Sequence, residues 1–262
     1  MRPRRGAPGG RPAQAPTGKT RGPLSLARAL SKFGVCSRRE AERWIEAGRV
    51  TVDGRPVPWP QKRIDPARNR VTVDGLRVGD DTERIVLVLH KPARYITSRT
   101  DPGGRPTVYD LMGDVDRWVF PVGRLDRDSS GLLVLTNDHR LGQRLTDPIH
   151  HVPKTYHVRV QGVPDDQALR ALRDGVALDG GTVSRPARVH PLGAVRGGEE
   201  AWLEVVLTEG RNRQVRRMCA AVGHGVRELV RVAIGGLKLG DLPAGRWRAL
   251  TPAEVRRLEA AG

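Results

Sequence analysis

The chain changes character near residue 84, and this change limits the folds that are open to it. Beyond that point, segments with the apolar or alternating pattern of strands recur at Ile85–Leu89, Gly131–Leu135, Thr155–Val160 and Trp202–Leu207. Helical spacing occurs at Asp165–Arg173 and Arg211–Val222, and a capped helix is predicted from Thr251 to about Ala260. Because strands outnumber helices and do not alternate with them regularly, the pattern predicts an α+β fold with a largely antiparallel sheet.

The part before residue 84 divides into a tail and a small module. Residues 1–23 contain six basic residues, no acidic residue and ten Gly or Pro, so we predict a disordered basic tail. This tail either contacts phosphates without reading sequence or only keeps the protein in solution. Order is expected from Leu24, and residues 24–82 form the predicted module.

Two helices and several short strands are expected in the module. Apolar residues from Leu26 to Phe33 follow helical spacing, and Gly34 ends this first helix. The segment Ser37-Arg38-Arg39-Glu40 has the pattern of a capping box, which begins the second helix. The sequence Val-Thr-Val-Asp-Gly then occurs at residues 50–54 and again at 71–75, and each copy predicts a strand followed by an Asp-Gly turn.

The charge of the chain indicates nucleic acid as its partner. Lys and Arg total 46 against 29 Asp and Glu, which gives a net charge of +17 on 262 residues. The sequence has no P-loop, no dinucleotide-binding glycine pattern and no metal-ligand spacing of His or Cys. Two distant cysteines exclude a disulfide framework, and no apolar run approaches the ~20 residues of a membrane span. We therefore expect a cytoplasmic protein that uses no nucleotide cofactor and no metal.

The segment Gly123–Asp138 carries the strongest chemical signal. It reads GRLDRDSSGLLVLTND, in which a loop rich in charged and small residues precedes an apolar strand. A carboxylate among so many arginines stays ionised and can act as a nucleophile. The alternative is that Asp126 and Asp128 are ion-paired loop residues that only fix the turn.

The module resembles a known RNA-binding domain. The segment LSLARALSKFGVCSRREAERWIEAGRVTVDGRPV is similar to the domain first seen in a small-subunit ribosomal protein, which we call the S-four-like domain. This resemblance implies that residues 24–82 dock on structured RNA and have no catalytic role. Phosphate contacts are then expected from Arg38, Arg39 and Arg43.

The remainder resembles the pseudouridine synthases that modify ribosomal RNA. The segment GRLDRDSSGLLVLTND matches their signature, and LVLHKPARYITS, KTYHVRV and EGRNRQVRRMCAAVGHGVRELVRVAIG agree with it in order and spacing. The resemblance implies a catalytic domain at residues 83–262 with a mixed, mainly antiparallel sheet flanked by helices. It also implies isomerisation of a uridine without a cofactor.

The resemblance assigns roles to five residues. Asp126 corresponds to the essential aspartate of the family, and Arg124 to the arginine that fills the gap left by the flipped nucleotide. Tyr156 corresponds to the tyrosine that packs on the uracil. Arg211 corresponds to the basic residue that pairs with the aspartate, and Val215 to an aliphatic wall of the uracil pocket.

Several alternatives remain open from the sequence. The segment EGRNRQVRRM is closer to the large-subunit type, which favours 23S over 16S rRNA, although Arg213 stands where relatives often have His. A catalytically silent RNA-binding assembly factor would keep the same fold, and a DNA-binding protein would share only the charge. The substrate is either free rRNA or a ribosomal subunit precursor, and a monomer is expected.

Overall fold

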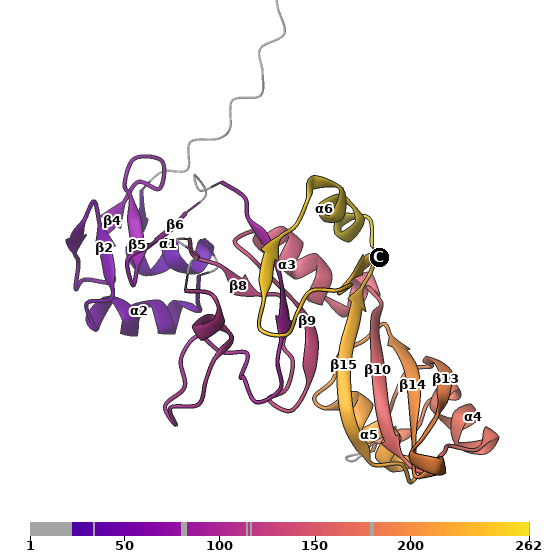
Figure 1. The fold of residues 1–262 in the computed structure, drawn as a ribbon. Helices are drawn as coiled ribbons and strands as arrows, with labels where there is room; N and C mark the ends of the chain where they lie inside the picture. Colours follow the sequence, from indigo (N-terminus) through magenta and orange to yellow (C-terminus); the bar gives the residue numbers. More distant parts are fainter. Residues whose placement is uncertain are drawn as a thin grey trace, which may run out of the picture.

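A computed structural model describes residues 23–33, 35–79, 83–113, 115, 117–178 and 181–261. Most of the predicted basic tail, residues 1–22, lies outside these ranges. The described chain is α+β, as predicted, with a four-stranded and a nine-stranded sheet as its main parts. Figure 1 shows the S-four-like unit at one end of the molecule and strands β13 and β14 toward the other.

The S-four-like unit combines two helices with short antiparallel strands. Strands β2, β3, β5 and β6 form the four-stranded sheet in the order β3-β2-β5-β6, and β1 pairs with β4 beside it. The bounds of its elements are β1 Leu24–Ser25, α1 Leu26–Lys32, α2 Arg38–Glu46, β2 Val50–Val52, β3 Arg55–Pro56, β4 Arg63–Ile64, β5 Val71–Val73 and β6 Leu76–Val78. Gly34, the predicted end of the first helix, lies outside the described residues.

Local sequence signals explain the shape of this unit. The Ser37 side chain accepts a hydrogen bond from the Glu40 backbone, and the Glu40 carboxylate accepts one from the Ser37 backbone, which confirms the predicted capping box. Asp53 and Asp74 have φ values of 52° and 51°, and each is followed by a glycine that is also left-handed. Both Asp-Gly turns therefore form as predicted, because two consecutive positive φ angles are what a tight hairpin turn requires.

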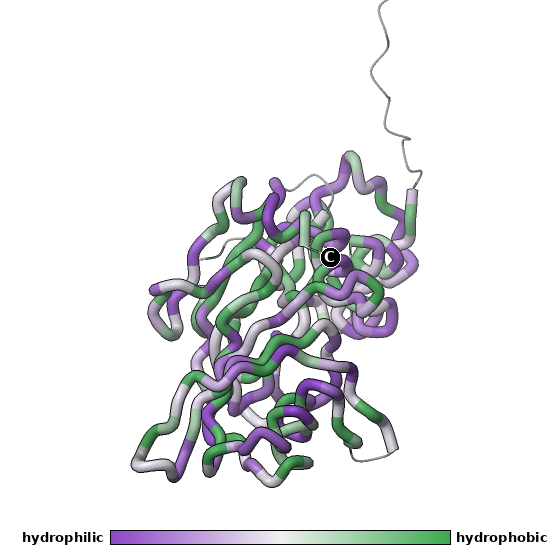
Figure 2. Tube along the Cα trace, turned by 90° about the vertical axis from the view of Figure 1, so that its right-hand side faces the viewer, coloured by the Kyte–Doolittle hydropathy of each residue, from purple (hydrophilic) through white to green (hydrophobic). Residues whose placement is uncertain are grey.

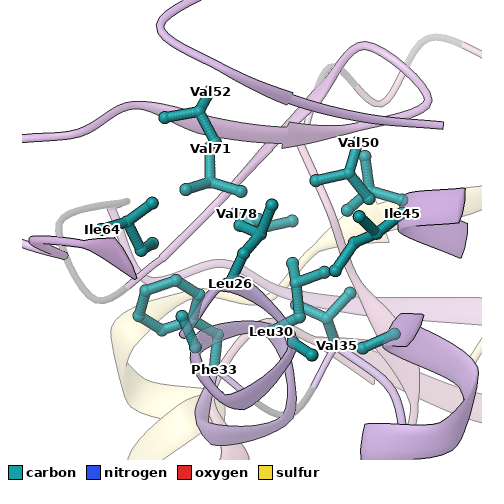
Figure 3. Packing of buried hydrophobic residues seen from close by; sticks show 14 of the residues in the cluster. Leu26, Leu30, Phe33, Val35, Ile45, Val50, Val52, Ile64, Val71 and Val78 are labelled. Carbon is teal, nitrogen blue, oxygen red and sulfur yellow. The ribbon is translucent and has the colours of Figure 1, made fainter. Parts of the chain in front are cut away.

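The core of the unit lies between the helix pair and the sheet. Figure 3 shows Leu26, Leu30 and Phe33 on one side of this core, facing Val50 and the neighbouring sheet valines. A residue from far along the chain, Trp118, is 5% exposed and belongs to the same cluster. The core of the first unit is therefore completed by the second.

Ring and charge contacts join the two units around Trp118. Its ring lies 5.6 Å from that of Trp44 on α2. The Arg99 guanidinium lies 3.6 Å from the Trp118 ring centroid and 4.6 Å from that of Tyr109. Arg99 also approaches Asp74 at 4.0 Å. Arg99, Tyr109 and Trp118 all belong to the larger unit. The two units are therefore joined by the Trp44–Trp118 ring contact, by the approach of Arg99 to Asp74 and by the burial of Trp118 in the first core.

The nine-stranded sheet is the frame of the larger unit. Its strand order is β13-β14-β10-β15-β9-β7-β17, with β16 on β15 and β8 on β9. Of the strand pairs in the described residues only β9 with β15 is parallel, which confirms a mixed, mainly antiparallel sheet. The bounds are β7 Val86–Lys91, β8 Phe120–Pro121, β9 Ser130–Thr136, β10 Lys154–Gln161, β13 Arg188–Val195, β14 Glu200–Leu207, β15 Val226–Ile234, β16 Leu237–Lys238 and β17 Trp247–Ala249.

Helices and short turns cover this sheet. The helices are α3 His139–Thr146, α4 Asp166–Asp174, α5 Gln214–Ala221 and α6 Pro252–Glu259, and the 3-10 turns are η1 Val108–Leu111, η2 Pro148–His150 and η3 Arg196–Gly198. A small hairpin joins β11 Ala177–Leu178 to β12 Thr182–Val183. No helix in the described ranges is both long enough and apolar enough to cross a membrane. Figure 2 shows hydrophobic segments along the strands and hydrophilic ones in many outer turns.

One helix begins later than the sequence predicts. The spacing predicted a helix from Arg211, but α5 starts at Gln214. Arg213 precedes it with φ 48° and ψ 33°, a left-handed conformation that the helix cannot include. Residues 211–213 consequently form a loop whose side chains are available to a site.

The parallel pair β9–β15 depends on Gly131. This residue has φ 106°, and a Cβ there would overlap the Arg231 carbonyl oxygen and lie 2.6 Å from the Arg231 nitrogen. Since backbone atoms cannot move aside as a flexible side chain can, only glycine allows β15 to approach β9 at this point.

We expect Gly131→Ala to destabilise the protein by about 3 kcal/mol, because it adds a backbone overlap to an unfavourable φ angle. Gly193→Ala is the matched control, since Gly193 has φ 125° and a Cβ added there would meet nothing within 4 Å. That variant should lose only about 1 kcal/mol. Urea unfolding of the full chain measures both values, and equal losses would contradict the steric argument.

Candidate active site

A pocket of about 380 Å³ opens beside the parallel strand pair. All five residues to which the sequence assigned catalytic or substrate-binding roles line it, namely Arg124, Asp126, Tyr156, Arg211 and Val215. These residues come from separate segments of the chain. They meet because β14, β10, β15 and β9 are consecutive neighbours in the sheet, so the loops and side chains at one end of these strands converge.

Asp126 lies on the loop that leads into β9, and Lys91 fixes this loop. The Lys91 side chain at the end of β7 is fully buried. Its Nζ donates hydrogen bonds to the carbonyl oxygens of Pro92, Asp126 and Ser129 at 3.0, 3.1 and 2.6 Å, with a longer contact of 3.4 Å to Arg127. One ammonium group thus binds carbonyls of the Asp126 loop together with the carbonyl of Pro92, which follows strand β7.

Burial and charge act in opposite directions on this lysine. Burial lowers the pKa of Lys91 to about 8, while the carboxylates of Asp126 and Asp128 act to raise it. The ammonium form, with three donors, therefore still predominates at pH 7. From the other side, Arg216 of α5 donates to the Asp128 carbonyl at 2.9 Å, so the loop is held by two cations.

Tyr156 lies beside an irregularity in the pairing of β10 with β15. The pairing of β10 with β15 passes from Thr155↔Ala233 to Tyr156↔Arg231, which leaves one residue of β15 unpaired. A bulge bends the strand that carries the extra residue, which here is β15, opposite Tyr156. Tyr156 packs against the apolar clusters on both sides of this position, while Val158 and Val160 beyond it are fully buried. The buried row that the sequence predicted behind Tyr156 is confirmed.

The cation beside Asp126 differs from the one expected. The resemblance implied a pair with Arg211, but in the structure Arg213 Nη1 lies 3.8 Å from Asp126 Oδ2. The two side chains are 46% and 30% exposed, so solvent screens this ion pair. The left-handed backbone of Arg213 directs this contact, and such strained residues are concentrated at functional sites.

Arg211 is bound instead to a buried carboxylate. Its Nε donates to Glu209 Oε2 at 3.0 Å, and Glu209 Oε1 accepts from the Arg185 backbone and from Gln214 Nε2. Burial raises the pKa of Glu209, but these hydrogen bonds outweigh it and the pKa lies below its ordinary value. The terminal nitrogens of Arg211 have no partner among the described residues, so they are available to a ligand.

Positive charge predominates in the pocket lining. Five cationic side chains face two carboxylates, those of Asp126 and Glu209. The cations are Arg124, Lys154, Arg211, Arg213 and Arg231. Arg231 is 4% exposed and donates from Nε to the Leu132 carbonyl at 2.7 Å. A pocket with this excess of guanidinium and ammonium groups suits a ligand that carries phosphate.

Comparison with known families agrees with this geometry. The family model described as RNA pseudouridylate synthase matches residues 85–221, and the S4 domain model matches residues 25–66. The chain belongs to the RNA pseudouridylate synthase family. The first match covers the Asp126 loop, Tyr156, Arg211 and Val215, and the second covers α1, α2 and the first strands of the S-four-like unit.

Individual relatives match over most of the chain. An RNA pseudouridine synthase of Aquifex aeolicus is 40% identical over 231 residues, covering 87% of this chain and 91% of its own. Ribosomal large subunit pseudouridine synthase B of Bacillus subtilis is 37% identical over 235 residues, covering 90% of this chain and 95% of its own. A crystal structure of a pseudouridylate synthase superposes with a TM-score of 0.64 at 28% identity, covering 90% of this chain and 99% of that one.

The three arginines expected to bind RNA are not part of the pocket of this pseudouridine synthase. Arg38, Arg39 and Arg43 are exposed on α2, and none of them lines the pocket. Arg38 makes an ion pair with Glu42 at 3.4 Å, which is exposed and therefore weak. No group of three or more His, Cys, Asp or Glu side chains in the described ranges is placed to hold a metal ion.

Sequence reasoning missed Lys91, Glu209 and Arg213. A lysine that ends the apolar strand Val86–Lys91 and precedes a proline was a usable signal, because a charge in such a strand requires buried partners. Glu209 comes two residues after the largely buried strand β14, so its charge also indicates buried partners. For Arg213 only the departure from the family pattern pointed to the site.

We expect Lys91→Met to lower kcat by about 100-fold with little change in KM for RNA, because the loop carbonyls lose their common donor and Asp126 is displaced. Lys238→Met, which removes an exposed lysine on β16, is the control and should retain the wild-type rate. Steady-state kinetics on RNA substrate measures the effect. A rise in KM with unchanged kcat would contradict a positioning role for Lys91.

Proposed function

We propose that this pseudouridine synthase converts a specific uridine of the large-subunit (23S) rRNA to pseudouridine. The observation that carries the proposal is the convergence of Asp126, Tyr156 and a row of cations in one pocket. The choice of the large subunit is supported by the name of the Bacillus subtilis relative, whose length is almost fully covered by the match. A 16S rRNA substrate is the alternative within the same reaction.

The proposed reaction detaches the uracil from its ribose, turns it, and rejoins it through a ring carbon. No electrons and no outside group enter or leave, so the chemistry requires neither a cofactor nor a metal. The target nucleotide first leaves the RNA stack, at a cost of roughly a few kcal/mol. Arg124 is exposed and makes no side-chain hydrogen bond or ion pair within the described residues, which supports its insertion into the vacated position.

Each further residue of the pocket has a part in this proposal. Tyr156 packs on the face of the uracil, and Val215, which is 5% exposed, forms the apolar wall. Asp126 acts on the nucleoside, either by adding to the sugar or by removing a proton from it. Arg213 neutralises the resting carboxylate, and Arg211 binds the substrate through its terminal nitrogens while Glu209 holds its Nε.

RNA docking and catalysis are divided between the two units in this proposal. Residues 24–82 bind structured RNA through phosphate contacts from Arg38, Arg39 and Arg43, and residues 83–262 carry the reaction. A net charge of +17 supports binding that weakens steeply with salt. We also propose that the enzyme is a cytoplasmic monomer that acts on rRNA or on a ribosomal subunit precursor.

Tritium release from rRNA labelled at C5 of uracil tests the function. We expect release by the wild type from 23S transcripts and none by Asp126→Asn, because an amide supplies neither a nucleophile nor a base. Asp128→Asn is the matched control, since its carboxylate belongs to the same loop and is 60% exposed. This variant should retain activity.

The outcomes separate the alternatives. Release from 16S transcripts alone would transfer the proposal to the small subunit. Equal activity of Asp126→Asn and wild type would remove Asp126 from catalysis. Absence of release from both transcripts and from subunit precursors, with RNA binding intact, would favour a silent assembly factor.

Arg211 provides a second test of the pocket. We expect Arg211→Ala to lower tritium release by about tenfold or more, because a charged hydrogen bond to the substrate is lost. The melting temperature should stay near that of the wild type, since Glu209 keeps its bonds from the Arg185 backbone and Gln214. Thermal unfolding followed by circular dichroism is measured in parallel, and full activity of the variant would refute the assignment.

A further inference from the structure

One large aromatic side chain of the S-four-like unit takes no part in its core. Trp59, on the loop between β3 and β4, is 68% exposed. The core of the unit is complete without it, because Trp118 and Trp44 supply the large rings there. Because single apolar side chains are common on protein surfaces, the backbone and charges around Trp59 decide whether it has a role.

The loop presents Trp59 on a fixed backbone. Pro58 and Pro60 flank it, and Pro60 is buried. The Pro60 carbonyl accepts a hydrogen bond from the Ala27 nitrogen at 3.1 Å, and the Trp59 carbonyl accepts one from the Lys62 nitrogen at 3.0 Å. The loop is thereby attached to the first turn of α1, so little backbone freedom is lost when the ring binds something.

The surroundings of Trp59 are positively charged. The segment 54–64 contacts the start of α1 through the bond from the Leu26 nitrogen to the Lys62 carbonyl and through the β1–β4 pair. Neither this segment nor residues 23–33 contain an acidic residue, and Asp53 and Asp65 border the segment. Together they carry five cations, which are Arg28, Lys32, Arg55, Lys62 and Arg63.

These cations are not neutralised by a carboxylate. None of the five has an ion pair among the described residues. An exposed aromatic ring beside unpaired cations is the combination with which proteins bind single-stranded RNA, because each base offers a face for stacking and each phosphate a charge. A protein partner would more often meet a larger apolar patch with fewer charges.

We infer that Trp59 is a stacking platform for an unpaired base of the RNA substrate, with Lys62, Arg63 and Arg28 binding the adjacent phosphates. This site is separate from the catalytic pocket and from the arginines of α2. It rests on the proposed function to the extent that the protein acts on RNA. It adds a contact to a single-stranded base, whereas the arginines contact phosphates only.

Binding of two oligonucleotides to the full chain tests this inference. One is a fluorescent 12-nucleotide oligouridylate, and the other is an abasic ribose-phosphate oligomer of the same length and charge. We expect the wild type to bind the first more tightly, and Trp59→Ala to lose about 5- to 100-fold in affinity for it while binding the abasic oligomer like the wild type. Trp59→Phe should keep most of the affinity, and Trp59→Leu should not.

Two controls exclude indirect effects. Val183→Ala removes another exposed apolar side chain, 59% exposed on β12, and should bind like the wild type. The salt dependence of Trp59→Ala should equal that of the wild type because stacking releases no counterions, whereas Lys62→Ala should lower the slope by about one. Melting temperatures of all variants should agree, since each altered side chain is exposed.

Three results would overturn the inference. They are equal affinity of the wild type for both oligomers, unchanged affinity of Trp59→Ala, and wild-type affinity of Trp59→Leu. Tritium release by the wild type on rRNA, measured beside these assays, separates the two proposals. Release together with any of the three results refutes the stacking platform alone. Absence of release from rRNA and from subunit precursors, with base-dependent binding, refutes the proposed function alone.

Discussion

The active site depends on one buried ammonium group. Lys91 closes the apolar strand β7 and binds the backbone carbonyls of Asp126 and of Ser129 beyond it. Burying a charge is costly unless it is fully hydrogen-bonded, and here the partners are backbone groups of the very loop that presents the carboxylate. The position of Asp126 is therefore tied to the sheet. A flexible surface loop would not hold it at the mouth of the pocket so firmly.

The opposite wall of the pocket is organised in the same way around Glu209. This buried carboxylate fixes the Arg211 Nε and the Gln214 amide, and so sets the end of the loop from which α5 begins. Arg213, held in a left-handed conformation at that point, faces Asp126. Glu209 accepts three hydrogen bonds, whereas among the described residues the Asp126 carboxylate has one solvent-screened ion pair, with Arg213. This difference accords with the proposal that Asp126 is the carboxylate that reacts.

The link between the units bears on how RNA reaches this pocket. Trp118 completes the core of the S-four-like unit and lies beside the Trp44 ring, and Arg99 approaches Asp74. Basic surfaces on α1 and α2 are thereby held at a set place relative to the catalytic sheet (Figure 1). A rigid link of this kind lets contacts far from the reacting base contribute to the choice of substrate, because their geometry is retained when RNA binds.

The sequence by itself determined the local features of this protein: the capping boxes at Ser37 and Thr251, the two Asp-Gly turns and the strand after the Asp126 loop. These depend on residues within a few positions of one another. The family resemblance added the five pocket residues, which spacing alone would not have joined. Only the tertiary structure decided that Arg213 faces Asp126, that Lys91 holds the loop and that Trp118 joins the first core. The physical reason is that such contacts join residues far apart in the sequence: 35 positions separate Lys91 from Asp126, and 99 separate Arg231 from Leu132. They depend on the order of the strands in the sheet and on the close approach of β15 to β9 that Gly131 allows.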